Sequence, residues 1–516
     1  MNDLSTLIST LLEKFPDKDI DEANLWRAVK TAIDPAKLIT VLAEAIRIPE
    51  TELEKIMKKK GLSELVARKR LLQKDKNILE KGEGYAISKQ SKSSNPYPKL
   101  FDFTFSPTLN SKIDITDEEV QFVESILGTI MEDSSDDPFL HLYRKDVLEY
   151  YNHFMDNDAK AIDKYISENF SAPPKYILNS GIGANEMFNH TIADFHNMEP
   201  KRKITWVVIS APKQLKELPS DATEKNTLFM EFSRSGKTEE TIKIHEFTSR
   251  STKRIVFANS GPLKELGLRD SNLVLDLSDQ VSGRFGRNKT PILLAPMYVA
   301  GLNTKEFWDY TCDAISNFNF SEKSNLPFQI ALFIYLYQQK NKINNIFFGV
   351  LGDNLSKSAD EFVQFWNEGL TKNGNDIILS KYFDLPRDSH IVVEGFLANF
   401  STKLGLFLFQ NVLNSQKLPP FAQLEIDPIN NAHKGYKFGQ DELVLAEANF
   451  LRYAELMPAI KIDVLGHLTL EHLAILSQLW TDITYSYSKL IGVDPGSNPE
   501  VKSVRERADT LLSQKR

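Results

Sequence analysis

A hydroxyl-rich turn is the first candidate for chemistry in this chain. An apolar run at residues 229–232 breaks into Ser-Arg-Ser-Gly-Lys-Thr at 233–238 and then resumes with helical spacing. A strand that ends in small hydroxyl residues just before a helix directs backbone N–H groups and hydroxyls at one point, at the positive end of the helix dipole. The same residue types also cap helices that bind nothing. The pattern predicts a phosphate cradle that bends at Gly236 and whose hydroxyls come from Ser233, Ser235, Thr238 and Thr241.

Three other clusters carry side chains suited to charge stabilisation or proton transfer. Arg284, beside a glycine, could bring a guanidinium to an oxyanion. Gln364 and Glu368 share one helix face if residues 359–368 are helical. The helix dipole disfavours a carboxylate at a carboxyl end, so the position of Glu368 favours a functional role. His390 precedes a predicted strand; a histidine there is more often structural, although imidazole suits proton transfer.

The elements that must position these residues alternate between short apolar runs and helical segments from about residue 170 onward. Such alternation predicts parallel sheets with helices on both faces, and therefore an α/β fold with two doubly wound, three-layer αβα domains. Ligands in these sheets bind beyond the carboxyl ends of the strands. Strands are predicted at 176–178, 204–209, 228–232, 254–257 and 273–277 in the first series, and at 346–351, 377–379, 391–393 and 460–464 in the second.

Length, net charge and cysteine count limit the classes of protein to which this chain can belong. A chain of 516 residues can hold two or more domains, and a formal charge of -8 with scattered lysines and arginines predicts no nucleic-acid or membrane-surface partner. Cys312 is the sole cysteine, which excludes an intramolecular disulfide and a cysteine-based metal site. The start of the chain lacks a basic leader with an apolar core, and no long apolar run follows. We expect a cytoplasmic protein without a membrane span.

The first part of the chain differs from the rest. Residues 1–85 are rich in Leu, Lys, Glu and Ala with apolar positions at helical spacing, which predicts a helical N-terminal extension. Residues 83–100 carry Gly, Ser, Asn and Pro, a composition typical of a linker.

Taken in order, these segments resemble the phosphoglucose isomerase family over residues 175–512. Gly181-Ile-Gly183 is similar to the start of the first glycine motif of the family, residues 233–241 to its phosphate loop, and residues 281–285 to its Gly-Gly-Arg-Phe signature. The segment from Gln364 to Lys372 resembles the one that carries the catalytic glutamate. Residues 490–501 resemble the C-terminal signature. Five motifs in the family order argue against coincidence.

The resemblance implies two SIS-type sugar isomerase domains, at 100–325 with preceding helices and at 326–485, with a helical segment at 486–516 that completes the active site. It implies reversible isomerisation of glucose 6-phosphate to fructose 6-phosphate through an enediolate, without a metal or redox cofactor, by a homodimer. Glu368 would move the proton between C2 and C1, Arg284 would stabilise the enediolate, and a histidine would open the sugar ring. His390 matches that last position, with His433 as a competing choice.

The chain departs from the family pattern at several positions. The catalytic lysine of the family falls at Arg505, which stabilises charge but cannot shuttle a proton; Lys502, about one helical turn away, is the alternative. Ala184-Asn185 stands in place of Gly-Ser, and Lys237 replaces a hydroxyl residue of the phosphate loop. The implied substrate-binding residues are Gly183, Ala184, Asn185, Ser233, Ser235, Lys237, Thr238, Thr241, Gly283, Gln364 and Asn498.

Two further interpretations stay open beside the isomerase. Arg505 and Asn498 are also compatible with a sugar-phosphate-binding regulatory protein that has lost efficient ring opening, whereas retention of Glu368 favours catalysis. The substitutions at Asn185 and Asn498 allow an isomerase of another phosphosugar.

Overall fold

The computed structural model describes residues 100–106, 116–132, 146–199, 201–277, 290–317, 325–352, 355–372, 377–385, 387–388, 400–410 and 440–496, together with 507 and 510. The helical extension predicted for residues 1–85, and the strand predicted at 391–393, lie outside these residues.

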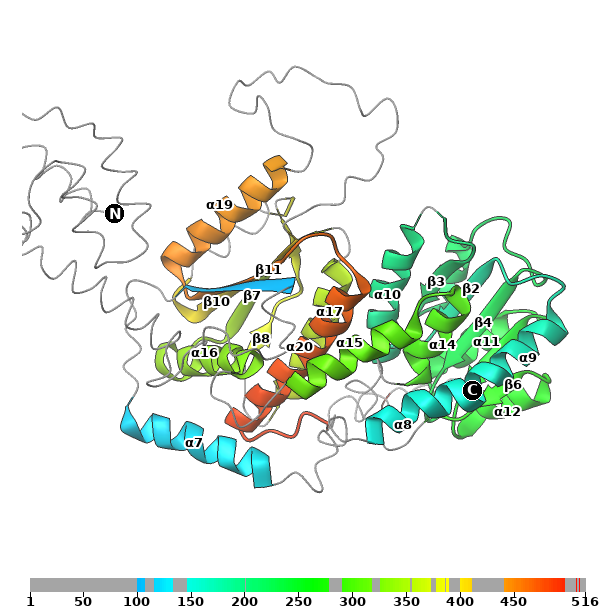
Figure 1. Ribbon diagram of the computed structural model, residues 1–516, viewed down its shortest axis with the longest axis horizontal. Coiled ribbons are helices and arrows are strands. Elements are labelled where there is room, and N and C mark those ends of the chain that lie inside the picture. Colours follow the sequence, from blue (N-terminus) through cyan, green and yellow to red (C-terminus); the bar gives the residue numbers. More distant parts are fainter. Residues whose placement is uncertain are drawn as a thin grey trace, which may run out of the picture. The chain divides into compact units, whose positions relative to one another are not determined.

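The first sheet is fully parallel and has the strand order β3-β2-β4-β5-β6 (Figure 1). Each of its strands was predicted from an apolar run, and β2 and β4 are buried along their whole length, as expected for strands covered on both faces. The strands are β2 (Tyr176–Ser180), β3 (Thr205–Ile209), β4 (Thr227–Phe232), β5 (Lys253–Phe257) and β6 (Leu273–Leu275).

Helices cover both faces of this sheet. On one face, Ile244 of α11 (Glu239–Phe247) packs on Leu178 and Phe229, and α12 (Gly261–Arg269) lies beside it. On the other, α10 (Ala184–Asn197) and α14 (Pro291–Ala300) pack against β2 and β3. The chain before residue 325 also forms α7 (Asp117–Glu132), α8 (Asp146–His153), η3 (Phe154–Asp158), α9 (Ala159–Asn169), η4 (Pro212–Glu217) and α15 (Thr304–Asn317). Of these, α7 and α15 contact α20 (Leu470–Leu490), a helix of the second sheet.

The second sheet has the order β1-β11-β10-β7-β8, with β9 beside β7. Its strands are parallel except β1, which pairs antiparallel with β11 at one edge. The predictions of β7, β8 and β11 are confirmed, whereas β1, β9 and β10 were not predicted. The strands are β1 (Phe101–Ser106), β7 (Asn345–Leu351), β8 (Ile378–Leu379), β9 (Phe383–Asp384), β10 (Lys403–Gln410) and β11 (Ala459–Val464).

Aromatic side chains anchor the helices of the second sheet. Phe347 and Phe407 pack with Tyr453 of α19 (Gln440–Leu456) on one face. On the other, Phe348 meets Trp480 of α20 (Leu470–Leu490) edge to face at 6.1 Å, and α17 (Leu355–Leu370) packs on both β7 and α20. The other elements are α16 (Leu326–Asn341) and η6 (Phe400–Thr402). The predicted α/β class with two parallel-sheet layers is confirmed.

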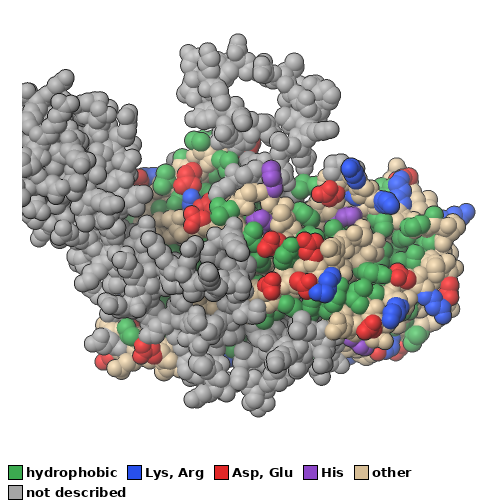
Figure 2. Space-filling view, viewed as in Figure 1, with side chains coloured by type: hydrophobic (Ala, Val, Ile, Leu, Met, Phe, Trp, Pro, Cys, Tyr) green, Lys and Arg blue, Asp and Glu red, His purple; other side chains and the backbone are tan. Residues whose placement is uncertain are grey.

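The surface of the described residues mixes charges of both signs. On the face shown in Figure 2, Lys and Arg side chains lie among Asp and Glu side chains, and the coloured surface carries no continuous basic patch. Within the part of the chain that the structure describes, none of the helices combines the length and the apolar character needed to cross a membrane.

Candidate functional site

The carboxyl edge of the first sheet brings two predicted motifs together. The chain leaves β2 toward β3 and reaches β4 on the other side of β2, so the strand order reverses between β2 and β4. The glycine motif at residues 181–183 follows β2, and the hydroxyl-rich turn at 233–238 follows β4. Such a switch point is where open α/β sheets bind their ligands.

The hydroxyl-rich turn is organised by Ser233. The buried Ser233 hydroxyl shares a hydrogen bond with Thr238 Oγ1 (2.7 Å) and accepts one from the Thr238 backbone N–H (3.3 Å). Ser235 Oγ accepts from the Lys237 N–H at 3.4 Å. Part of this hydroxyl set therefore holds the turn itself, as capping residues do. Thr238, at the N-cap of α11, makes no side-chain capping bond, so it leaves the first N–H groups of α11 for another acceptor.

Gly236 allows the turn to touch the next loop. Its φ is 63°, and a Cβ built on it would lie 1.7 Å from the Ser260 carbonyl oxygen. The Leu263 N–H also donates to the Gly236 carbonyl at 3.0 Å, at the start of α12. The sequence predicted a bend at Gly236; the structure adds a close approach between two backbones that leaves no room for a side chain.

Buried hydroxyls without a partner lie on the α11 side of the same sheet edge. Thr241, in the first turn of α11, has no exposed surface, and its Oγ1 has no hydrogen-bond partner among the described residues. The same holds for Ser180 Oγ at the end of β2, whose register partner on β4 is Glu231. Sequence analysis missed Ser180; its position as the last strand residue before the glycine motif was the available signal. Unpaired buried hydroxyls are costly, which favours an acceptor or donor arriving here.

Gly183 connects this edge to the helix that carries the predicted base. Gly183 has a φ of 64°, and a Cβ on it would lie 2.9 Å from Gln364 Nε2 on α17. Gln364 Nε2 donates to Glu368 Oε1 at 3.0 Å, one helical turn on, and Gln364 Oε1 is buried without a partner among the described residues. The predicted helix at 359–368 is confirmed within α17. Both side chains are half-buried.

The end of α17 meets the C-terminal motif. Lys372 Nζ donates to the Asp494 carbonyl oxygen at 3.2 Å. A Cβ on Gly369 would lie 3.6 Å from Pro495 Cβ, an ordinary contact. Two of the segments that carry the family resemblance, far apart in sequence, thus adjoin in the fold.

Several predicted site residues cannot be placed. Ala184 and Asn185 begin α10, but their side chains are not described. Outside the described residues lie Gly283, Arg284, His390, His433, Asn498, Lys502 and Arg505. Within the described residues, His, Cys, Asp and Glu side chains form no group of three or more that could hold a metal ion.

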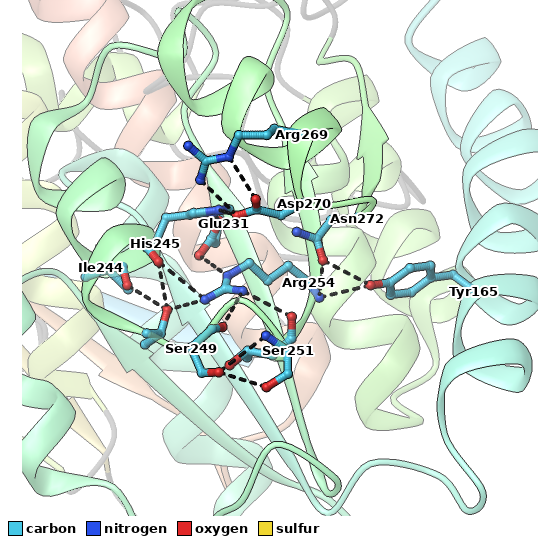
Figure 3. A network of polar contacts seen from close by, with 12 residues as sticks. Tyr165, Glu231, Ile244, His245, Ser249, Ser251, Arg254, Arg269, Asp270 and Asn272 are labelled. Carbon is cyan, nitrogen blue, oxygen red and sulfur yellow. Dashed lines mark hydrogen bonds and ion pairs between the residues drawn. The ribbon is translucent and has the colours of Figure 1, made fainter.

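A buried network of charged and polar side chains joins β4, β5 and α11 (Figure 3). His245 of α11 contacts Glu231 Oε2 through Nδ1 (2.6 Å) and Asp270 Oδ2 through Nε2 (3.2 Å). Arg254 Nε of β5 donates to Glu231 Oε1 at 3.2 Å. Sequence analysis did not single out these residues. The available signal was one acidic and one basic residue, Glu231 and Arg254, within otherwise apolar strand runs.

Asp270 is expected to stabilise the fold above about pH 4 and to lose that effect in acid. Hydrogen bonds from the Arg269 guanidinium, together with His245, hold the pKa of the Asp270 carboxyl well below its usual range. Since an unfolded aspartate titrates near about 3.9, the stabilisation is complete above that value and is lost as the pH falls through the folded-state pKa. The free energy of unfolding, measured with urea, should differ more between the wild type and Asp270→Asn at about pH 7 than at about pH 3. A difference that does not change with pH would contradict this assignment.

Comparison with known proteins identifies the fold. No family model and no curated protein sequence matches the chain. Among solved structures, a hypothetical protein from Thermus thermophilus is similar with a TM-score of 0.62 and 18% identity, over 80% of this chain and 100% of that one. A glucose-6-phosphate isomerase from Chlamydia trachomatis is similar with a TM-score of 0.61 and 12% identity, over 81% of this chain and 89% of that one. The chain therefore shares the two-sheet fold of these proteins.

Proposed function

We propose that this chain is an aldose–ketose isomerase of phosphosugars that interconverts glucose 6-phosphate and fructose 6-phosphate through an enediolate. The observation that carries the proposal is the close approach of Gly183 to Gln364, whose Nε2 would lie 2.9 Å from a Cβ on residue 183. It joins the sheet edge that bears the hydroxyl-rich turn to the helix that bears Glu368. An anion site and a carboxylate base so connected are the two parts that this reaction needs.

In this proposal the hydroxyl-rich turn and the start of α11 bind the phosphate group. Exposed Lys237 adds a positive charge at the same turn. Phosphate binding is remote from the reacting carbons, and its free energy orients the sugar toward the base. Gln364 Oε1, which has no partner among the described residues, is available to a substrate hydroxyl, while Nε2 keeps Glu368 in place.

Glu368 then takes the proton from C2 and returns it to C1. The proton transfer develops negative charge on the enediolate oxygens, for which Arg284 is the proposed cation. His390 or His433 is the proposed ring-opening group, with Arg505 or Lys502 as its counterpart. The proposed assembly is a homodimer, which the mass of the protein in solution tests.

The test is conversion of fructose 6-phosphate to glucose 6-phosphate by the purified chain, followed through a coupled NADP-linked dehydrogenase. Turnover supports the proposal. A parallel panel of other ketose and aldose 6-phosphates shows whether the chain isomerises a different phosphosugar. Binding of these sugar phosphates with no turnover of any of them would overturn the isomerase in favour of a regulatory binding protein.

A further inference from the structure

The buried network around His245 has no part in the proton transfers of the proposed reaction, yet it is built around the turn that binds the phosphate in that proposal. Glu231 lies on β4 two residues before Ser233, and His245 lies on α11 one helical turn after Thr241. The contact between Glu231 and His245 therefore joins the two ends of a segment that contains the whole hydroxyl-rich turn. We propose that His245, held between Glu231 and Asp270, is a positioning residue for the phosphate site; this inference rests on the proposed function.

The network fixes α11 against its neighbours on two sides. The 2.6 Å contact from His245 Nδ1 to Glu231 joins α11 to β4, and the 3.2 Å contact from Nε2 to Asp270 joins it to the end of α12. At its other end, α12 contacts the turn itself through the Leu263 N–H and the Gly236 carbonyl. Strand β4, α11 and α12 are thus tied to one another both at the turn and at His245.

Arg254 ties down the chain after α11. Its Nη1 donates to the Ser249 and Thr252 carbonyl oxygens at 3.1 Å each, and its Nη2 donates to Thr248 Oγ1. Because Arg254 has no exposed surface and Glu231 has none either, water does not screen this ion pair. Any shift of α11 along the sheet must break buried charged hydrogen bonds, which is costly.

Position matters here because the first N–H groups of α11 are the proposed phosphate donors. Binding sites require their donors to be held within about 0.5 Å of the productive geometry. Each ring nitrogen of His245 lies within hydrogen-bond distance of a different carboxylate, so this one side chain contacts both neighbours at once.

The test measures orthophosphate affinity of the full-length chain by calorimetry. His245→Gln should weaken orthophosphate binding by about tenfold or more, because both N–H donors of glutamine are on one nitrogen and its other polar atom is an acceptor oxygen, so it cannot take the place of two ring nitrogens that each face a carboxylate. Asp270→Asn, which keeps the side-chain shape and loses one charged contact, should weaken it by roughly threefold. With the sugar phosphate as substrate, His245→Gln should raise KM by more than it lowers kcat, since Glu368 lies on a different helix.

The matched control is His196→Gln. His196 is also a buried histidine and lies on α10, which packs on the first sheet. Its Nε2 contacts the Ile204 carbonyl oxygen at 2.8 Å, outside the network. The His196→Gln variant should lose stability but keep an orthophosphate affinity within about twofold of the wild type. Wild-type affinity in His245→Gln would overturn this inference and leave the isomerase proposal intact. If that variant does not fold, unchanged affinity in Asp270→Asn overturns it instead. Failure of the wild type to bind orthophosphate would overturn both.

Discussion

Replacement of Glu368 with glutamine is expected to lower kcat for phosphosugar isomerisation by about 10²- to 10⁴-fold, the usual contribution of a general base. Glutamine keeps the length of the side chain, and its carbonyl oxygen can still accept the 3.0 Å hydrogen bond from Gln364 Nε2. The local structure should therefore survive, and KM should change by less than about tenfold. Glu368→Asp keeps the carboxylate but withdraws it by one methylene, so it should retain part of the activity lost in Glu368→Gln.

The control is Glu361→Gln on the same helix. Glu361 is fully buried and accepts a hydrogen bond from Ser477 Oγ at 2.7 Å, so it packs against α20. The substitution is chemically identical but lies two turns from Glu368, and turnover should stay within about threefold of the wild type at a temperature where the variant is folded. Equal turnover in Glu368→Gln and the wild type would show that another group is the base.

Gly236→Ala should destabilise the protein by about 2–5 kcal/mol and weaken phosphate binding. The positive φ of 63° costs an alanine roughly 1–2 kcal/mol. The contact at 1.7 Å from the Ser260 oxygen adds an overpacking cost of about 1–3 kcal/mol. Since the clashing atoms belong to the backbone, relief requires the two loops to separate, which displaces the start of α11. Urea unfolding and orthophosphate titration measure the two effects.

Gly301→Ala separates these contributions. Gly301 ends α14 with a φ of 81°, and a Cβ there would have nothing within 4 Å. It should lose only the roughly 1–2 kcal/mol that positive φ costs and should keep its phosphate affinity. If the two alanine variants lost equal stability and bound phosphate equally, the close approach at Gly236 would have no role in the site.

The strands that sequence patterns predicted are those with a strong local signal. Apolar runs such as 204–209 and 346–351 are rich in β-branched or aromatic residues and lie between polar turns, and both form strands. β10 was missed because its run of Leu, Phe and Gly carries no β-branched residue and no period that separates a strand from a buried helix. In β1, apolar and polar residues alternate clearly, but the strand lies at the edge of the second sheet. Its partner β11 comes more than three hundred residues later, and no local pattern reveals such a pairing.

By itself the sequence determined the α/β class, the turn after β4 with its hydroxyls, and the shared helix face of Gln364 and Glu368. All three depend on residue type and on spacing within one segment. Tertiary structure alone decided the approach of Gly183 to Gln364, the backbone contact between Gly236 and Ser260, and the charged network around His245. These join segments that are distant in sequence or lie on different elements. Which buried polar groups meet is set by how the strands order and the helices pack, because a buried charge is tolerated only where the fold supplies its partner.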